Sequence, residues 1–184
     1  NWKVQIFRRL KYGENVIIKT WARTSSKVST LRDFEVYDSN NNLTCIATTR
    51  WTLVNADTQT ITKITDDIID RYNPEEKAVF PDFIFKKLEE PADFSNEYVY
   101  TTQRRDIDVN KHMHNLNYLD LAYETLPEDI YLNSNFDNIE IMYKSAIVLG
   151  DTVKCLYTKE GNKHIIVIKS IDGKKLHCII NLFH

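Results

Sequence analysis

The chain has 184 residues, of which 42% are hydrophobic and 27% charged, as is ordinary for a globular protein of one large or two small domains. A formal net charge of -2 gives no indication of nucleic-acid binding, which usually needs a strongly basic surface. No apolar run has the length of a membrane span, and no signal peptide is visible. Cys45, Cys155 and Cys178 lack CxxC spacing, which favours reduced core thiols in a cytoplasmic protein over disulfides or a zinc site.

Residues 14–55 have the pattern of an antiparallel β-meander. Residues 16–21 are β-branched and aromatic, and residues 31–37 alternate with a period of two, as strands do. The polar run 38–42 predicts a turn, after which residues 43–54 return to extended structure.

The middle of the chain has weaker signals. Residues 66–71 predict a short helix that ends at Asn73-Pro74, and two later prolines indicate extended connections. We therefore expect residues 61–95 to be an inter-domain linker.

A strand at residues 98–102 precedes the strongest helix signal of the sequence. Apolar side chains recur at helical spacing from residue 116 to residue 126, and Pro127 ends the pattern. His114 or Asn115 is placed to cap the first turn of this helix.

A second β-meander is predicted from residue 138 to residue 184, with four strands at 139–143, 153–158, 165–170 and 176–183. Its long strand opens with Gly150-Asp151-Thr152-Val153, much as Gly13-Glu14-Asn15-Val16 opens the corresponding strand of the first meander. The spacing of the two halves is nearly constant, which predicts an internal duplication. Chance similarity of two meanders is the alternative.

A strand, a helix and an antiparallel meander in this order are typical of the hot-dog fold, in which a sheet wraps around a central helix. We predict an α+β double hot-dog, with residues 1–60 as the first half and residues 96–184 as the second half. The first half has no matching helix in this chain, so we expect its helix and N-terminal part to lie upstream of Asn1.

Asp108, Asn110 and His112 stand two residues apart, so on an extended segment their side chains share one face. A carboxylate, an amide and an imidazole together can activate water, hold a carbonyl and transfer a proton near neutral pH. On a straight strand, however, Asp108 and His112 would lie roughly 13 Å apart, at about 3.3 Å per residue. They can cooperate only if the segment curls before the helix.

Such a curl would also aim the start of the helix at the site. The free N–H groups and dipole near His114 and Asn115 could then stabilise an oxyanion. The structural alternative is a polar loop that only caps the helix, which is the usual role of Asp, Asn and His at such a place.

The run from Arg105 to Tyr118 resembles the active-site motif of acyl-acyl carrier protein thioesterases. That motif has the form Asp-x-Asn-x-His-Val-Asn-Asn-x-x-Tyr and precedes a helix that ends in Glu-x-x-Pro, here Glu124 and Pro127. Further landmarks lie in the first half and extend the resemblance over most of the chain: Thr20-Trp21, Arg32-Asp33-Phe34, Trp51 and Ile61-Thr62-Lys63-Ile64.

The resemblance implies a double hot-dog fold and hydrolysis of the thioester between a fatty acid and the phosphopantetheine arm of acyl carrier protein. It implies no metal and no cofactor, and an acyl pocket mainly in the first half. Asp108, Asn110 and His112 match the catalytic Asp, Asn and His of the family. We predict that Asp108 acts as base or nucleophile, His112 transfers the proton and Asn110 positions the reactants.

The chain departs from the plant pattern after the helix. Plant members carry Glu-Cys in a Tyr-Arg-Arg-Glu-Cys context, whereas Ala146-Ile147 stands here in the run 143–147. A cysteine nucleophile at that position is thus excluded, which favours hydrolysis by an activated water. In addition, His114 replaces a family Asn and Leu121 replaces a helix Trp.

Acyl carrier protein is acidic, so a basic patch should meet it. The candidates are Arg8, Arg9 and Lys11, or Arg104 and Arg105, and ordinary solvated charges are the alternative. An acyl-CoA thioesterase and a non-catalytic acyl-binding sensor are the competing functions. The sequence leaves a monomer and a homodimer equally open.

Overall fold

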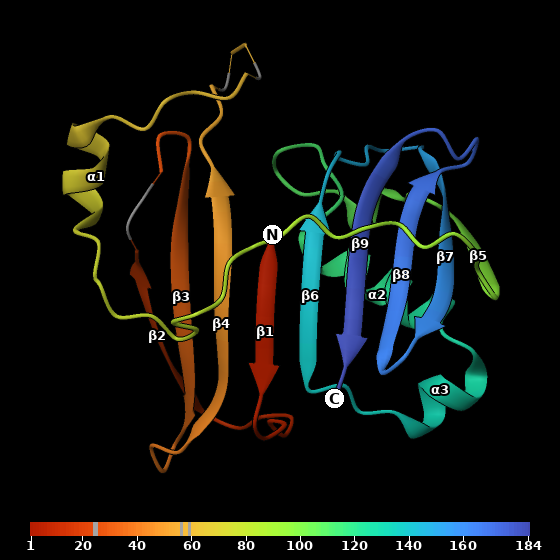
Figure 1. Cartoon of the computed structure of the whole chain (residues 1–184), viewed down its shortest axis with the longest axis horizontal. Coiled ribbons are helices and arrows are strands. Elements are labelled where there is room, and N and C mark those ends of the chain that lie inside the picture. Colours follow the sequence, from red (N-terminus) through yellow and green to blue (C-terminus); the bar gives the residue numbers. More distant parts are fainter. Residues whose placement is uncertain (24–25, 56, 59) are drawn as a thin grey trace. The chain divides into compact units, whose positions relative to one another are not determined.

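The computed structural model describes residues 1–23, 26–55, 57–58 and 60–184, and it divides into two compact units, Asn1–Lys86 and Lys87–His184 (Figure 1). Each unit is built around an antiparallel sheet. Among the described residues, no helix has the length and apolar character needed to cross a bilayer.

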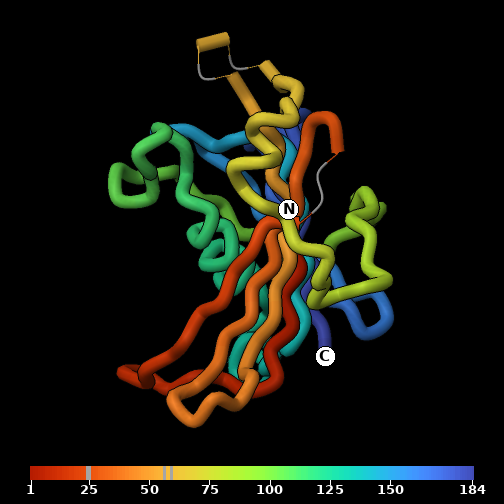
Figure 2. The backbone as a smooth tube through the Cα atoms, turned by 90° about the vertical axis from the view of Figure 1, so that its left-hand side faces the viewer, coloured from red at the N-terminus to blue at the C-terminus, as the bar shows by residue number. Residues whose placement is uncertain are grey.

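The first unit has four strands, which pair in the order β2-β3-β4-β1. Their bounds are β1 Trp2–Ile6, β2 Val16–Ala22, β3 Ser29–Asp38 and β4 Leu43–Thr52. The turn between β3 and β4 is held by the Asp38 carboxylate, which accepts the amides of Asn40 and Asn42 at 2.9 Å each. This turn lies beside the loop after β1 at one end of the unit, as Figure 2 shows and as an ion pair between Arg8 and Asp38 requires.

Part of the predicted linker packs against this sheet. Helix α1, Asp66–Tyr72, follows β4, and its C-cap Asn73 takes the left-handed conformation. Beyond it, the Trp21 indole donates to the Lys77 carbonyl, and the Val79 amide donates to the fully buried Asp33 carboxylate. Residues 73–79 therefore cover one face of the first sheet.

The second unit has five strands in the order β6-β9-β8-β7-β5. The strand bounds are β5 Asn96–Thr101, β6 Asn138–Tyr143, β7 Thr152–Glu160, β8 Lys163–Ser170 and β9 Leu176–Phe183. Between β5 and β6 lie a 3-10 turn at Arg104–Asp106 and two α-helices, α2 Asn115–Thr125 and α3 Glu128–Asn133.

Helix α2 lies against one face of this sheet and contacts β5, β7 and β9 (Figure 1). Its inner residues Leu121, Ala122 and Thr125 are buried, and the Asn96 amide of β5 donates to the Thr125 carbonyl. The opposite sheet face carries a second apolar cluster of Met142, Ile165, Val167 and Ile179, covered by Leu88, Phe94 and Leu176. The central strands are thus buried on both faces.

The two units repeat one strand order. The order β2-β3-β4-β1 corresponds to β7-β8-β9-β6, and Gly13 and Gly150 both adopt positive φ, at 78° and 86°, before the first strand of their series. This correspondence supports the predicted duplication. The helix that the first unit does have, α1, contains no buried residue and follows its strands, so it does not correspond to α2.

Candidate functional site

The segment that carries the predicted catalytic residues is a tight turn. Ile107 pairs with Met113 as an antiparallel bridge, the Asp108 amide donates to the His112 carbonyl at 2.8 Å, and Lys111 has a φ of 62°. The segment is therefore not extended, and the curl that the catalytic prediction requires is present. One backbone hydrogen bond thus joins Asp108 to His112 across the turn and brings the two residues together.

The Asp108 carboxylate also stabilises this turn. Its Oδ1 accepts the Asn110 amide at 2.8 Å and the His112 amide at 3.3 Å, which fixes the orientation of the side chain. Its Oδ2 has no hydrogen-bond partner within the described part of the chain. Asn110 is exposed at the tip of the turn, so the structure brings Asp108 and His112 together and leaves Asn110 at the rim.

A second aspartate, Asp106, anchors the turn to the rest of the unit. Its carboxylate is almost fully buried and accepts the Tyr100 hydroxyl and the Gln103 amide, both at 2.7 Å. Its carbonyl accepts the His114 amide at 2.7 Å and the Asn117 side-chain amide at 3.2 Å. Asp106 therefore joins β5, the turn at residues 107–113 and the start of α2.

Helix α2 begins directly after the turn. His114 is its N-cap, as predicted, and the His114 Nδ1 accepts the Leu116 amide at 3.2 Å. The amide of Asn115, the first helical residue, has no carbonyl within the helix to bind. The Asn115 carbonyl in turn accepts the Tyr143 hydroxyl at 3.1 Å, which ties the helix start to β6.

The position of the plant Glu-Cys pair lies beside the turn. The Ile147 carbonyl accepts the Met113 amide at 2.8 Å, and Val148 pairs with His112 as an antiparallel bridge. Ala146 is exposed. This segment thus contributes backbone to the site where the plant sequences supply a carboxyl and a thiol.

The sequence reasoning missed Tyr118, although it was part of the quoted motif. Its hydroxyl accepts the Ile147 amide at 3.3 Å, and its ring packs edge-on against Tyr143 with centroids 5.1 Å apart. An aromatic residue on the buried side of a helix is ordinary core, so only the tertiary contact distinguishes it.

The arginines predicted to bind acyl carrier protein differ in how their charges are balanced. The Arg8 guanidinium forms ion pairs with Glu14 and Asp38, so much of its charge is balanced locally. Arg105 lies 3.8 Å from the Asp106 carboxylate, and Arg104 is exposed.

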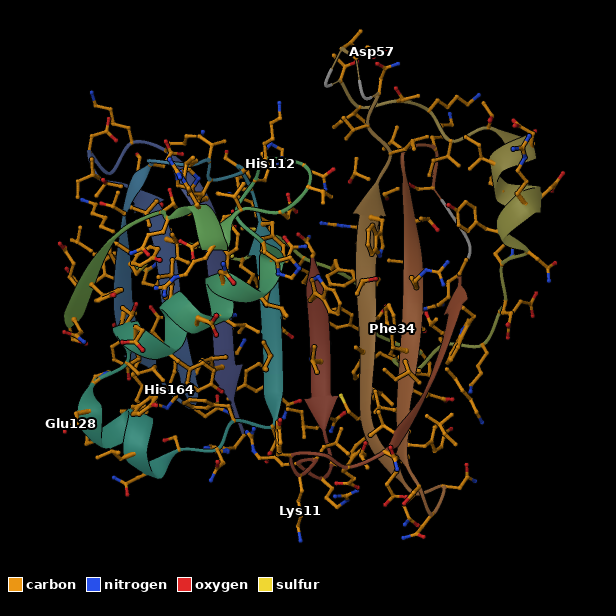
Figure 3. The ribbon with its side chains drawn as sticks, turned by 180° about the vertical axis from the view of Figure 1, so that it is seen from behind. Lys11, Phe34, Asp57, His112, Glu128 and His164 are labelled. Atoms are coloured by element: carbon orange, nitrogen blue, oxygen red, sulfur yellow. The ribbon has the colours of Figure 1, made fainter. Side chains whose placement is uncertain are left out.

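His164 lies far from the turn that carries His112, and the thiols of Cys155 and Cys178 are too deeply buried to react. His164 lies at the other end of the second unit from His112 (Figure 3), with its Nδ1 2.9 Å from the Tyr157 hydroxyl. Burial lowers the pKa of His164. Cys155 and Cys178 are fully buried, and burial raises the pKa of Cys155 to about 12, so neither is a nucleophile at neutral pH.

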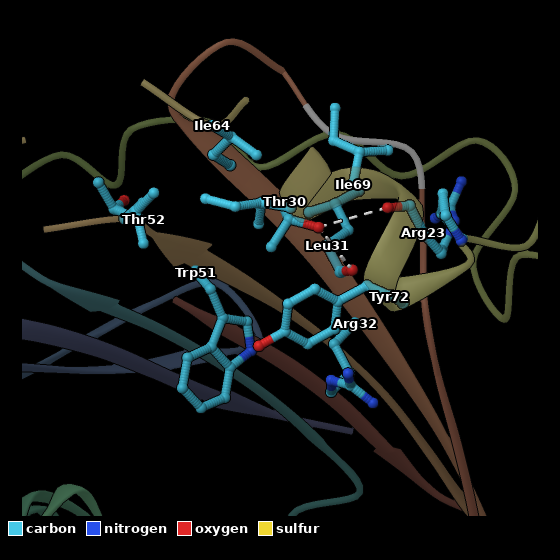
Figure 4. A pocket seen from close by; sticks show the side chains of 13 residues that line it. Arg23, Thr30, Leu31, Arg32, Trp51, Thr52, Ile64, Ile69 and Tyr72 are labelled. Carbon is cyan, nitrogen blue, oxygen red and sulfur yellow. Dashed lines mark hydrogen bonds between the residues drawn. The ribbon is translucent and has the colours of Figure 1, made fainter. Parts of the chain in front are cut away.

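The first unit contains an apolar pocket of about 370 Å³ between α1 and the ends of β3 and β4 (Figure 4). Its apolar wall includes Leu31, Trp51, Leu53, Ile64, Ile69 and Tyr72. The polar side chains at its margin include Arg23 and Arg32. A pocket of this size and lining suits a hydrocarbon group.

Comparison with known protein families gives two matches in sequence order. Residues 1–72 match the acyl-ACP thioesterase N-terminal domain, and residues 89–180 match the acyl-ACP thioesterase C-terminal domain. The oleoyl-acyl carrier protein thioesterase 1 of Arabidopsis thaliana is 29% identical over 84% of the chain and 46% of its own length. The dodecanoyl-[acyl-carrier-protein] hydrolase of Umbellularia californica is 25% identical over 86% of the chain and 43% of its own length. The chain thus spans less than half the length of these relatives.

Solved structures share the fold. The 12:0-ACP thioesterase from Umbellularia californica superposes with a TM-score of 0.86 at 20% identity, over 99% of the chain and 70% of that protein. An acyl-ACP thioesterase from Bacteroides thetaiotaomicron superposes with a TM-score of 0.80 at 19% identity, over 99% and 73%. The predicted α+β double hot-dog fold class is confirmed.

Proposed function

The chain belongs to the acyl-ACP thioesterase family, and we propose that it hydrolyses fatty acyl thioesters of acyl carrier protein to free fatty acid and carrier protein. The observation that carries this proposal is the turn that sets Asp108 opposite His112 directly before α2. This arrangement supplies a base, a proton carrier and a helix N-terminus at one place.

In the proposed reaction, Asp108 accepts a proton from a water molecule as that water attacks the thioester carbonyl. The two amides on Asp108 Oδ1 hold the carboxylate in place, which leaves Oδ2 for the water. The Asn115 amide and the helix dipole stabilise the oxyanion. Asn110 positions the reactants at the rim. The tetrahedral intermediate then expels the pantetheine thiolate, which takes a proton from His112, and His112 receives in return the proton that Asp108 took from the water, so both groups are restored.

This route needs no thiol. The family position of the plant cysteine is held by Ile147, which contributes its backbone to the turn instead. Ala146 stands where the plant sequences have a glutamate, so the carboxyl group of that glutamate is missing here. We therefore assign the role of general base to Asp108.

We further propose that the acyl chain enters the apolar pocket of the first unit, since the family resemblance predicts the acyl pocket in that half. The lining by Leu31, Ile64 and Ile69 supports this assignment. Residues 1–60 and 96–184 are proposed as the two hot-dog halves with residues 61–95 as linker. The cytoplasmic location and the homodimer stay predictions, to be measured by fractionation and by light scattering.

The experiment that tests the function compares acyl-ACP substrates with the matching acyl-CoA substrates. We expect the wild-type chain to release fatty acid faster from acyl-ACP, and Asp108→Asn to lower kcat by about 10²–10⁴-fold. Asn retains an oxygen for the amides of Asn110 and His112, so circular dichroism of the variant should stay unchanged.

Three outcomes would contradict the proposal. Near-normal turnover of Asp108→Asn removes Asp108 as base. Faster hydrolysis of acyl-CoA than of acyl-ACP would show that acyl-CoA is the substrate. Tight acyl binding without product release would indicate a sensor.

A further inference from the structure

The second unit has two tight turns beside the candidate site, at residues 108–111 and 148–151. In each turn, the amide of the last residue donates to the carbonyl of the first, at 3.0 Å and 3.1 Å respectively. The antiparallel bridge between His112 and Val148 connects the end of the first turn to the start of the second. The two turns therefore lie side by side.

Each turn is held by an aspartate carboxylate of its own. Asp108 Oδ1 accepts the Asn110 amide at 2.8 Å, and Asp151 Oδ2 accepts the Val148 amide at 3.0 Å. Gly150 has the positive φ, 86°, that the third position of a type II turn requires. Both conformations are thus fixed before a partner arrives, which lowers the entropic cost of binding to them.

The second residue of each turn is an exposed aliphatic residue. Val109 is 97% exposed and Leu149 is 54% exposed, and Val148, which begins the second turn, is 42% exposed. One exposed aliphatic residue is ordinary, whereas three on adjoining turns beside a polar site form an apolar patch. An apolar patch with a polar rim is typical of a protein–protein interface.

Basic side chains flank this apolar patch. The Thr102 hydroxyl donates to the Val148 carbonyl at 2.7 Å, so the 3-10 turn that follows, with Arg104 and Arg105, starts beside the second tight turn. Lys111 ends the first tight turn, and all three cationic residues are exposed. The patch therefore has positive charge on both sides.

The acidic residues of residues 102–112 and 148–151 do not balance this charge at the surface. None of them is exposed, and each carboxylate accepts a backbone amide: Asp106, Asp108 and Asp151. The surface here is thus locally positive, although the whole chain has a formal net charge of -2. Such a surface complements a partner whose contact face is acidic and partly apolar.

The exposed residues of this region form what we call the turn surface: Val109, Val148, Leu149, Arg104, Arg105 and Lys111. We propose that acyl carrier protein docks on the turn surface, with acidic side chains over the cations and apolar ones on the patch. This inference rests on the proposed function and names the surface through which its partner binds. The carrier must hold its thioester at Asp108 and His112, which belong to or directly follow the first turn, and this position favours a carrier protein over a lipid surface.

The test compares acyl-ACP with acyl-pantetheine of the same chain length, which has the arm but no protein. Leu149→Ser removes an exposed apolar side chain and changes none of the proposed catalytic groups. We expect KM for acyl-ACP to rise roughly three- to tenfold with kcat preserved, and kcat/KM for acyl-pantetheine to stay at the wild-type value. Added salt should likewise raise the wild-type KM for acyl-ACP and not for acyl-pantetheine.

Leu132→Ser is the matched control, because Leu132 of α3 is 68% exposed. Helix α3 starts at Glu128, which lies at the other end of the second unit from His112 (Figure 3). This variant should keep the wild-type KM on both substrates, and both variants should keep the wild-type melting temperature. If Leu149→Ser keeps the wild-type KM for acyl-ACP, or changes KM equally on both substrates, the inference is overturned.

A binding measurement separates this inference from the proposed function. Holo-ACP without an acyl chain, titrated by calorimetry, should bind the wild type more tightly than Leu149→Ser even if no acyl-ACP is hydrolysed. Binding of this kind without hydrolysis would overturn the thioesterase alone. Hydrolysis that Leu149→Ser leaves unchanged would overturn the turn surface alone.

Two other occupants of the turn surface would give different results, and either result would overturn docking of the carrier. One is binding to vesicles of anionic phosphatidylglycerol that Leu149→Ser abolishes while KM for acyl-ACP stays unchanged, which would indicate a membrane. The other is a dimer, measured by light scattering, that Leu149→Ser dissociates while KM for acyl-ACP again stays unchanged, which would indicate a second copy of the chain.

Discussion

At the scale of single residues, the Asp108 carboxylate divides its two oxygens between structure and chemistry. Oδ1 holds the turn through two amides, and Oδ2 is left for a proton. Local side-chain bonds of this kind are why Asp is common in turns, so the capping explanation and the catalytic one apply to the same residue. Asp108→Asn separates them because it preserves the turn and removes the charge.

The arginines give a residue-scale prediction about carrier binding. Arg104 is exposed, whereas Arg8 is paired with Glu14 and Asp38. Arg104→Glu should therefore raise KM for acyl-ACP several-fold and weaken its salt dependence, with kcat preserved. Arg8→Glu should instead lower the melting temperature, since it faces two carboxylates. Steady-state kinetics at two salt concentrations, with thermal melts, check both, and equal KM values for Arg104→Glu and wild type would exclude Arg104.

At the scale of elements, helix α2 links the site to the core. Its inner face is buried against the sheet, and its first turn is capped by His114 and tied to β6 through Tyr143. The cap and the proposed chemistry use different amides of the first turn: His114 accepts the amide of Leu116, and the amide of Asn115 stays available. The cap therefore leaves the Asn115 amide for the oxyanion of the proposed reaction.

His114→Ala should cost about 0.5–2 kcal/mol of unfolding free energy, because the Leu116 amide loses its acceptor. For a chain of this length, each kcal/mol corresponds to about 2–4 °C in melting temperature. His114→Asn, which restores the family residue and a capping oxygen, is the matched control and should keep the wild-type melting temperature. Equal stability of the Ala and Asn variants would show that the cap contributes nothing.

At the scale of the whole molecule, two units repeat one strand order and differ in what their sheets pack against. The second unit buries Cys155 and Cys178 completely, and burial raises the pKa of both thiols. In the first unit, Cys45 is only partly buried. The thiols thus report on the integrity of each unit.

In native buffer, a water-soluble thiol reagent should modify Cys45 first and leave Cys155 and Cys178 unmodified until denaturant opens the second unit. Peptide mass spectrometry over a denaturant series measures this order. Rapid native labelling of Cys155 would contradict a closed core in that unit.

The sequence by itself determined most of the elements, because the burial of one face of a strand or helix leaves a local period. The helix predicted at 116–126 is α2 Asn115–Thr125, and the strand predicted at 176–183 is β9. The prediction missed β1, where Trp2, Val4 and Ile6 do alternate with polar residues, but over five residues only. It also missed α3, whose six residues are too short to show a helical period. The motif alone pointed to Asp108 and His112.

Only the tertiary structure decided how those two residues meet. Asp108 and His112 come together because the Lys111 backbone adopts a positive φ and because His112 pairs with Val148, which lies far along the chain. Likewise, Tyr118 contacts Ile147 because α2 lies beside the connection between β6 and β7. Arg8 pairs with Asp38 because the loop after β1 lies beside the turn after β3. A local period encodes which face is buried but not what lies on the other side of it, since partners distant in sequence are selected by packing of the whole unit.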